Sequence, residues 1–437
     1  MKISAFQVSI LVFSIVVIVA AVLIFSGVIP VGTKQEASTD LTGNFVVWGT
    51  FRSDGIRGFF DQLAVGNNGL KVNYVTKDPR TFSLELAEAI ASGQGPDLIL
   101  FSQEDILQNE AKLLLLPYES YPERTFRDTY IEEASLFLLP KGIVGLPIAV
   151  DPVVMYYNKT LLENAGYAVP PKTWDVVLGI TPSLTKKQGD LTISQSAVPF
   201  GVYGNLNNAK DIISMLVMQA GDPIVAKQGE GFNATLGYDA GKDVPPAESA
   251  LQFFTQFSNP LSQAYTWNRA QIPARDAFVR ESLVMYFGYA SELPLIAEKN
   301  PNLNFDMTKV PQIPQARANT TFGKVYALGI IKAGKKVQQS VSLASVLTGK
   351  DNAGKLAEVL SQTAPIAPAR RDLISTAPET TYGPVVYSSG LMARGWYDPG
   401  DYYTDPIMST LIDDVIRGAA SLSEAISKAR TQLQLVL

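Results

Sequence analysis

The chemistry open to this chain is limited first by the residue types that it lacks. Its 437 residues include no histidine and no cysteine. Thiolate nucleophiles, disulfides, zinc fingers, imidazole metal sites and every mechanism with a histidine base are therefore excluded. What remains is carboxylate chemistry, either a hard-cation site or the acid pair of a glycoside hydrolase. We predict no cofactor and no metal centre.

Asp151 is the acid whose position most suggests a role in binding. It ends the apolar run of residues 146–150 and precedes Pro152, where a carboxylate gains nothing obvious from packing. A carboxylate there can accept charge-assisted hydrogen bonds from hydroxyl groups. Glu281 is a conceivable partner in a hydrolase, but nothing sets the two acids at the separation that such a mechanism needs. We therefore predict a ligand-binding residue and no catalytic one.

Aromatic residues are concentrated near the end of the chain. Six fall within 22 positions, namely Tyr382, Tyr387, Trp396, Tyr397, Tyr402 and Tyr403. Aromatic rings fill cores first, so packing is the simpler explanation for most of them. Trp396 is the exception, because Gly395 and the "DPG" of residues 398–400 predict a loop, where solvent access is common. We expect Trp396 to offer its ring to a ligand.

Other candidate ligand contacts rest on weaker patterns. Trp267 has polar neighbours in "SQAYTWNRA", and Phe101 stands at the end of a predicted strand. For both, core packing and ligand contact remain open. Tyr203 and Asn205 complete the aromatic and amide candidates.

Polar residues also follow two predicted strands. Phe51, Arg52 and Asp54 come after the first strand, where a helix amino terminus offers free backbone donors to a ligand. Asp54 could equally cap that helix. Ser102 and Gln103 follow another strand and are ambiguous in the same way.

Charge and composition set the class of protein. Lysine and arginine total 36 against 41 aspartate and glutamate residues, a net charge of −5. No basic footprint for nucleic acid is present. With 46% hydrophobic and 18% charged residues, the chain is expected to fold.

The first residues predict a membrane anchor. Residues 8–29 carry no charge, and as a helix they would extend about 33 Å, enough to cross a hydrocarbon core. A cleaved signal peptide is the alternative, although its apolar stretch is usually shorter. We expect a cytoplasmic end at 1–7, a single span at 8–29, a linker at 30–42 and an extracytoplasmic body.

The body alternates predicted strands and helices. Strands are expected at 45–48, 70–75 and 97–101, and helices at 54–63 and 82–91. This βαβαβ order predicts an α/β fold with parallel strands. Near the end, an apolar stripe over 408–416 and a capping box of Ser421 with Glu424 predict two amphipathic helices.

Several motifs together resemble one family. The chain contains "GPD" at 95–97, "YYNK" at 156–159 and "PKTW" at 171–174, with "ARDAFVRESLVMYFG" from residue 274 and "PIAPARRD" from residue 365. This combination resembles the extracellular solute-binding proteins of the maltodextrin-binding class, the receptors of bacterial ABC importers. The resemblance covers nearly everything after residue 43.

The resemblance implies a two-lobed periplasmic-binding-protein fold of the class II type. It places 43–150 with 325–365 in the N-terminal lobe and 151–324 with 366–437 in the C-terminal lobe, with a crossing at Asp151. Where the family has a proline-tryptophan pair after Gly288, this chain has "GYASEL", so Tyr289 is the candidate for stacking there.

The implied function is a membrane-tethered, monomeric receptor that captures a carbohydrate and presents it to ABC permease subunits. The identity of the sugar stays open, as does another polar solute. A carboxylate-pair hydrolase and a surface receptor or adhesin with the same fold are the alternatives.

Overall fold

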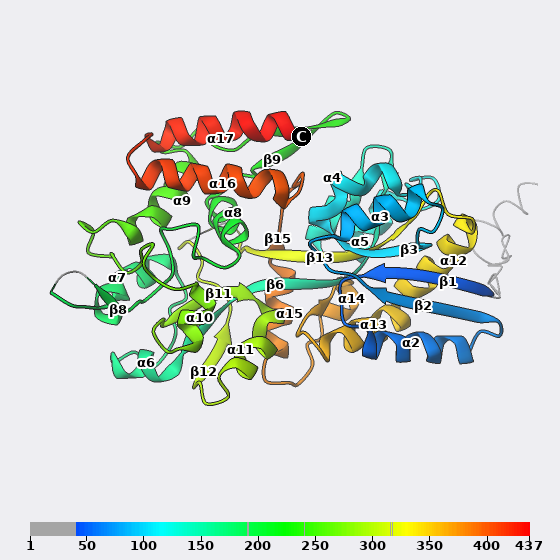
Figure 1. Ribbon diagram of the computed structural model, residues 1–437, viewed down its shortest axis with the longest axis horizontal. Coiled ribbons are helices and arrows are strands. Elements are labelled where there is room, and N and C mark those ends of the chain that lie inside the picture. The colour runs from blue at the N-terminus through cyan, green and yellow to red at the C-terminus, as the bar shows by residue number, and fades with distance from the viewer. Residues whose placement is uncertain (1–40, 190–191, 240, 315, 317) are drawn as a thin grey trace, which may run out of the picture.

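The computed structural model describes residues 41–437 apart from 190–191, 240, 315 and 317. The described chain forms two lobes, joined by long strands of one sheet (Figure 1). Neighbouring strands in this sheet are β11 (Met285–Tyr289), β6 (Leu146–Asn158), β13 (Thr321–Ile330), β3 (Leu98–Ser102), β1 (Gly43–Gly49) and β2 (Leu70–Thr76).

The first lobe begins with the predicted βαβαβ unit. β1 pairs in parallel with both β2 and β3, which confirms the three strands and their direction. α2 (Ser53–Val65) and α3 (Phe82–Ala91) connect them, and Phe82 and Leu86 of α3 are buried as their spacing predicts. The α/β class is therefore confirmed.

Smaller elements complete this lobe and its junction with the second one. They are α4 (Ile106–Asn109), α5 (Glu123–Thr129), β4 (Leu138–Leu139), β5 (Gly142–Ile143), α12 (Val337–Thr348), α13 (Lys350–Ser361), β14 (Ala367–Pro368), α14 (Arg371–Ile374), α15 (Gly383–Leu391) and β15 (Ala393–Arg394).

Two strands carry the chain between the lobes. β6 pairs with β13 from Leu146 to Pro152, and then with β11 from Val153 to Tyr157. Asp151 therefore lies where β6 changes partner. Tyr326–Ile330 of β13 pair with β3 of the first lobe, so β13 lies between β6 and β3 from Tyr326 to Leu328.

The second lobe is richer in helices. Its helices are α6 (Lys159–Asn164), α7 (Trp174–Leu184), α8 (Ala209–Ala220), α9 (Pro246–Thr255), α10 (Ala274–Val279), α11 (Leu293–Lys299), α16 (Asp401–Ile416) and α17 (Leu422–Val436). Its strands besides β11 are β7 (Lys186–Lys187), β8 (Ile193–Gln195), β9 (Val225–Gln228), β10 (Gly231–Ala234) and β12 (Phe305–Thr308). Trp174 and Phe200 pack at 5.8 Å in an aromatic core. The predicted capping box of Ser421 and Glu424 opens α17.

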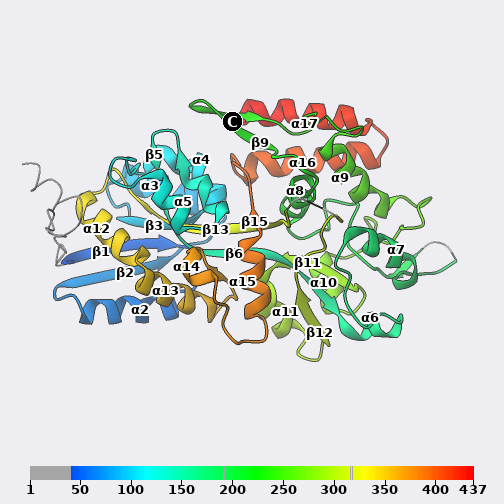
Figure 2. The same cartoon turned by 180° about the vertical axis from the view of Figure 1, so that it is seen from behind.

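The segment after residue 366 was expected to belong to the second lobe, but its contacts lie elsewhere. Ala367 and Pro368 pair with β6, the Ala369 carbonyl accepts from the Ile131 N–H at 2.9 Å, and α14 packs against α5. α15 then lies against β6, on the side seen in Figure 2. These contacts keep the segment on the first lobe and the connecting strands until β15, so we propose a crossing back near Ala393 rather than at 366.

The expected membrane span and linker, residues 8–29 and 30–42, lie almost wholly outside the described residues. Within residues 41–437, gaps excepted, no helix has the length and apolar character needed to cross a membrane.

Candidate functional site

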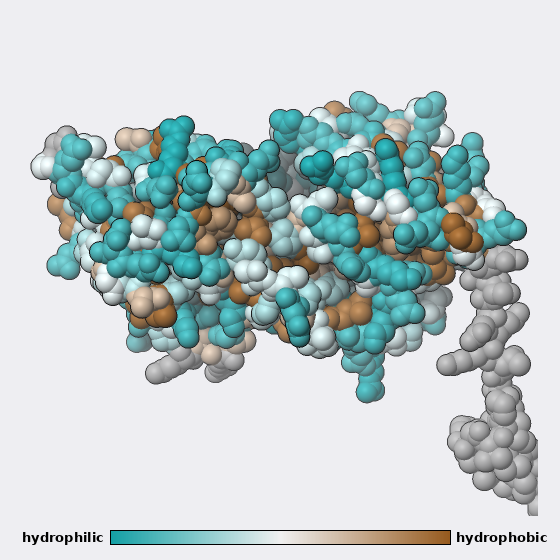
Figure 3. All heavy atoms as spheres, turned by 90° about the horizontal axis from the view of Figure 1, so that it is seen from below, coloured by the Kyte–Doolittle hydropathy of each residue, from teal (hydrophilic) through white to brown (hydrophobic). Residues whose placement is uncertain are grey.

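A cavity of about 460 Å³ lies between the lobes, at the carboxyl end of β3. The first lobe contributes Thr50, Pro79, Arg80, Phe82, Ser83, Leu84, Leu100, Phe101, Ser102, Glu104, Asp105 and Gln108; β13 contributes Lys324 and Tyr326; and the second lobe contributes Gly400, Asp401 and Tyr402. We call this cavity the cleft. Figure 3 shows the molecule hollowed between the lobes. Crevices at strand carboxyl ends are where open α/β sheets bind ligands.

A second, larger cavity has a different character. It measures about 820 Å³ and is lined only by residues between Gly354 and Tyr387. Because one continuous segment forms its whole lining, movement of one lobe against the other would not enclose a ligand there. The cleft, with walls from both lobes, is the better candidate for ligand capture.

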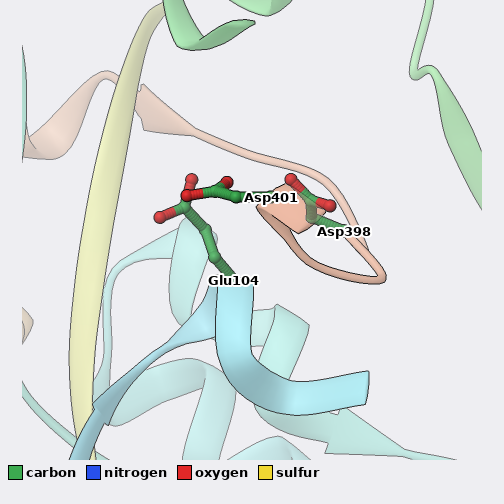
Figure 4. Close-up of side chains that lie close together, drawn as sticks. All are labelled: Glu104, Asp398 and Asp401. Atoms are coloured by element: carbon green, nitrogen blue, oxygen red, sulfur yellow. The ribbon is translucent and has the colours of Figure 1, made fainter. Parts of the chain in front are cut away.

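An ionic network adjoins the cleft, and its members Glu104, Lys324 and Asp401 belong to the cleft lining. Lys324 Nζ lies 2.8 Å from Glu104 Oε2, and Lys210 of α8 pairs with Asp398 and Asp401. The same Lys210 Nζ is 3.9 Å from Glu104 Oε1. Figure 4 shows the Glu104 and Asp401 carboxylates close together, with Asp398 on the loop that precedes α16. The network thus joins the two lobes across the cleft.

Burial and mutual charge set the protonation of this network. Burial opposes the charged form of Lys210, but the facing carboxylates of Asp398 and Glu104 raise its pKa well above the ordinary value. Burial raises the pKa of Asp105 to about 6 and that of Asp211 to about 7, with repulsion from Glu104 adding to both. Burial also opposes the charged form of Lys324, but Glu104 and Asp211 raise its pKa well above the ordinary value. Both lysines therefore stay charged at neutral pH, while Asp105 and Asp211 can hold protons.

Three carboxylates in the network have the spacing of a cation site. Oxygen atoms of Glu104, Asp398 and Asp401 lie within 4.8 Å of one another. The ammonium group of Lys210 already binds the two aspartates. A divalent ion would have to displace this lysine, so the arrangement is an internal ion-pair network.

The candidates that follow strands fall into two groups. Phe101 and Ser102 line the cleft, and Phe51 packs edge-on against the lining residue Tyr326 at 4.6 Å. Arg52 and Asp54 instead form an exposed pair at 3.6 Å outside the lining. Arg52, and not Asp54, occupies the N-cap position of α2, without a side-chain hydrogen bond.

Two polar candidates are occupied in holding strands together. Gln103 donates to the Gly323 carbonyl at 3.0 Å and accepts from the Val325 N–H at 2.6 Å, so both amide atoms bind β13. Asp151 is 3% exposed and accepts from the Ser291 N–H at 3.1 Å. Burial raises the pKa of Asp151 to about 7. Neither side chain lines the cleft, so a ligand contact for Gln103 and for Asp151 stays a prediction.

Trp396 also differs from the prediction. It stands on a loop as expected, but it is 2% exposed and donates from its indole N–H to Ser214 at 3.2 Å. The loop is folded against α8, which removes the predicted solvent access. Trp396 is a core residue in this structure.

The remaining candidates lie inside the second lobe. Trp267 is fully buried and donates to Asn205 at 2.8 Å, while the Asn205 amide holds the carbonyls of Asn268 and Gln271. Their polar neighbours thus serve internal hydrogen bonds. None of this group, which includes Tyr203 and Tyr289, lines the cleft.

Hydroxyl groups of the two tyrosines are likewise engaged. Tyr203 donates to Asp405 at 2.5 Å, and Tyr289 donates to Asp211 at 2.6 Å. Tyr289 lies below Lys324, whose Nζ is 4.8 Å from the ring centroid. It therefore supports a cleft residue without reaching the cleft.

Several lining residues were missed from the sequence. Tyr402 is 82% exposed at the start of α16, within the aromatic-rich segment but six positions beyond the chosen Trp396. Glu104 directly follows the chosen Ser102 and Gln103. The signals were present, but the sequence does not show which neighbour faces the cleft. Lys324 and Asp401 carried no such signal.

The acids considered for hydrolysis are not brought to the cleft. Asp151 is buried in β6, and Glu281 lies on an exposed turn with a φ of 59°. Neither belongs to the cleft lining.

Comparisons with known proteins agree with this architecture. A family model described as "Bacterial extracellular solute-binding protein" matches residues 60–381. Binding proteins of Brucella abortus (strain 2308) and Brucella suis biovar 1 (strain 1330) are each 21% identical over 386 residues, covering 83% of this chain and 87% of theirs. The crystal structure of a cyclo/maltodextrin-binding protein complexed with maltotetraose aligns with a TM-score of 0.71 at 16% identity, over 92% of this chain and 98% of that chain.

The structural likeness shows the two-lobed α/β solute-binding fold. The family match covers well over half of the chain and includes the motifs at 95–97, 156–159 and 171–174. This chain belongs to the bacterial extracellular solute-binding proteins.

Proposed function

We propose that this protein captures a carbohydrate in the cleft and delivers it to the permease of an ABC importer. The observation that carries the proposal is the pairing of an exposed aromatic ring, Tyr402, with cleft walls of carboxylate, hydroxyl and ammonium groups. Sugar rings offer an apolar face to aromatic side chains and hydroxyl groups to polar ones. The maltotetraose bound to the structural neighbour supports the same ligand class.

The proposal assigns the protein no chemical reaction. The acids that line the cleft, Glu104, Asp105 and Asp401, are tied into ion pairs or hydrogen bonds with neighbouring side chains. A binding role uses such acids as fixed acceptors. The protein acts outside the cytoplasm, as its family does.

Attachment to the membrane by residues 8–29 is a separate part of the proposal. It rests on the uncharged run of the sequence alone. Intact-mass analysis of membrane-extracted protein should find residues 1–25 still present. Recovery of a soluble chain that starts beyond Gly27 would contradict the anchor and favour a cleaved signal.

A thermal-shift screen against a panel of saccharides tests the central proposal. A ligand at 100 times its Kd should raise the free energy of unfolding by about 2.7 kcal/mol. Tyr402→Ala should weaken binding of the best ligand by about tenfold, because it removes the exposed ring. The matched control is Tyr238→Ala, since Tyr238 is 41% exposed and lies outside the cleft lining. Equal affinity of the two variants would place the sugar elsewhere.

A further inference from the structure

A β-hairpin of the second lobe extends to the first lobe. β9 and β10 pair in antiparallel fashion, and residues 229–230 form the tip between them. The Ala234 N–H donates to Gln434 Oε1 of α17 at 2.9 Å, which fixes the base of the hairpin on the second lobe. Figure 1 and Figure 2 both show the hairpin extending from α17 toward the first lobe. We call residues 225–234 the strap.

Two polar contacts join the strap to the first lobe. Lys227 Nζ donates to the Leu138 carbonyl of β4 at 3.1 Å. At the tip, Glu230 Oε2 lies 3.3 Å from Nζ of Lys141, in the turn between β4 and β5. Burial lowers the pKa of Lys227, as expected for an ammonium group that is partly withdrawn from water. The strap therefore contacts the first lobe with both its side and its tip.

The contact at the tip is polar and accessible to water. The Lys141 and Glu230 side chains are 70% and 77% exposed. Beside them lies a cavity of about 550 Å³, lined by Glu230 of the strap and by first-lobe residues that include Leu114 and Leu115. Closely packed interfaces leave no such space, so the tip can leave the first lobe without opening a core. Water would solvate both charges again, which keeps the free-energy cost of separation small.

Rotation of the lobes changes these contacts directly. The strands β6 and β13 join the lobes, whereas the strap meets the first lobe through the side chains of Lys227 and Glu230. When the second lobe rotates away, both side chains move away from their partners. Interactions that exist in only one arrangement of the lobes shift the equilibrium toward that arrangement. The strap contacts therefore favour the arrangement in which both lobes line the cleft.

We propose that the strap holds the lobes together around the cleft and slows the release of a bound solute. The proposal deepens the function proposed above and rests on it for the solute. Its basis is the fraction of chains with the cleft assembled, because the apparent Kd rises as that fraction falls. Loss of the strap contacts should act mainly on dissociation, since the lobes must part before a solute can leave.

Zero-length cross-linking tests the contact without a ligand. A carbodiimide activates carboxylates, and a neighbouring lysine amine then displaces the activating group to form an amide, with a net loss of water. Peptide mass spectrometry of the full chain should find Lys141 joined to Glu230. The positive control is Lys428 with Asp414, whose charged groups lie 2.8 Å apart within the second lobe. A cross-link in the control pair alone would overturn the proposal.

Charge reversal tests the effect on binding. With the tightest-binding member of the saccharide panel as probe, Glu230→Lys should raise the dissociation rate about fivefold, because it sets two ammonium groups together. The double variant, Lys141→Glu with Glu230→Lys, restores opposite charges and should return the rate to within about twofold of the parent. A general folding defect would not be reversed by the second change. Failure of this rescue would show that the ion pair does not hold the lobes.

Lys227→Met measures the second contact. It removes a charge-assisted hydrogen bond and should raise the dissociation rate of the same probe about tenfold. The matched control is Lys309→Met, at an exposed lysine of the second lobe outside the strap, which should keep the parent's rate. Equal rates for these two variants would contradict the proposal and leave the carbohydrate function intact.

Failure of the proposed function has a different signature. If no saccharide of the panel stabilises the parent chain, the carbohydrate function fails, and small-angle scattering then tests the strap by itself. Glu230→Lys should raise the radius of gyration, and the double variant should lower it again. Equal radii for the parent and the two variants would overturn the role of the strap as well.

Discussion

The two walls of the cleft are built in different ways. On the first lobe, Phe101 and Ser102 line it because they end β3, which is parallel to β1 and antiparallel to β13. On the second lobe, the wall is Gly400 with the start of α16, and an ion pair between Asp398 of the preceding loop and Lys210 joins residues 188 positions apart. Local sequence fixes the first wall, whereas a contact between distant segments fixes the second.

The largest effect is expected from removing Lys210, whose ion pairs hold the second wall in place. Lys210→Met should lower the free energy of unfolding by about 3 to 5 kcal/mol, because it leaves the buried Asp398 without its partner. Urea denaturation of the full chain measures the loss. Exposed Lys355 provides the control, and its replacement by Met should change stability by less than about 0.5 kcal/mol. Similar losses in both variants would mean that the network does not hold the second wall.

The same difference explains what the sequence could predict. The helix predicted over 82–91 has those bounds in the structure, because the spacing of Phe82 and Leu86 and the following "SGQG" are local signals. Strands 70–75 and 97–101 agree to within a residue at each end. Ser102, at the end of β3, accordingly lines the cleft, whereas its neighbour Gln103 does not.

Burial separates the aromatic candidates of the second lobe for a physical reason. Trp396 and Tyr402 share one aromatic-rich segment, yet the first is 2% and the second 82% exposed. Packing against α8 buries Trp396, and α8 begins nearly two hundred positions earlier. No pattern within the segment itself reveals that contact. Trp267, for which core packing and ligand contact were both left open, is fully buried, and its indole N–H donates to Asn205.

Substitution of Trp396 tests the contrast between this buried ring and the exposed ring of Tyr402. Trp396→Ala should cost about 3 to 5 kcal/mol of unfolding free energy, as expected for a large buried ring that leaves a cavity. Tyr402→Ala should cost less than about 0.5 kcal/mol while weakening the ligand. Thermal unfolding without ligand distinguishes the two variants. If Trp396→Ala leaves stability unchanged but weakens ligand binding, then Trp396 contacts the ligand and is not a core residue.

Glu133 is a buried acid beside Arg394 and Gly395, and its ionisation tests the electrostatics there. It lies in the short helical segment Glu132–Phe137 and is 3% exposed, and burial raises its pKa to about 8, although Arg394 and the Gly395 N–H oppose the shift. The folded state therefore holds this proton more tightly than the unfolded state. Stability should fall as pH rises from about 4.5 to 8, by about 1.4 kcal/mol per pH unit from this group.

Glu133→Gln should remove that dependence. The variant should match the parent near pH 5, where Glu133 is already neutral in the folded chain, and should exceed it in stability near pH 8. Exposed Glu119→Gln is the control, with an effect on stability that does not change with pH. Denaturation curves at pH 5, 6, 7 and 8 give the comparison. Parallel curves for the Glu133→Gln variant and the parent would show that Glu133 is ionised throughout.

The smallest expected loss of stability concerns the contact between Gln108 of the first wall and residues 399–400 of the second. Gln108 of the first lobe donates to the Pro399 carbonyl at 3.1 Å, and a Cβ on Gly400 would lie 1.4 Å from its Nε2. Gly400 also has a φ of 113°, which disfavours any side chain.

Gly418 has a φ of 67° and open space around it, so Gly418→Ala imposes backbone strain without the collision. Gly418→Ala should lose about 1 kcal/mol of stability, and Gly400→Ala about 1 to 3 kcal/mol, because its φ of 113° and ψ of 150° are accessible essentially only to glycine. Only Gly400→Ala should hold the lobes apart, which would raise the radius of gyration in small-angle scattering with ligand present and weaken ligand binding. If the two variants scatter and bind alike, Gln108 moves aside, and the contact between Gln108 and Pro399 does not control closure.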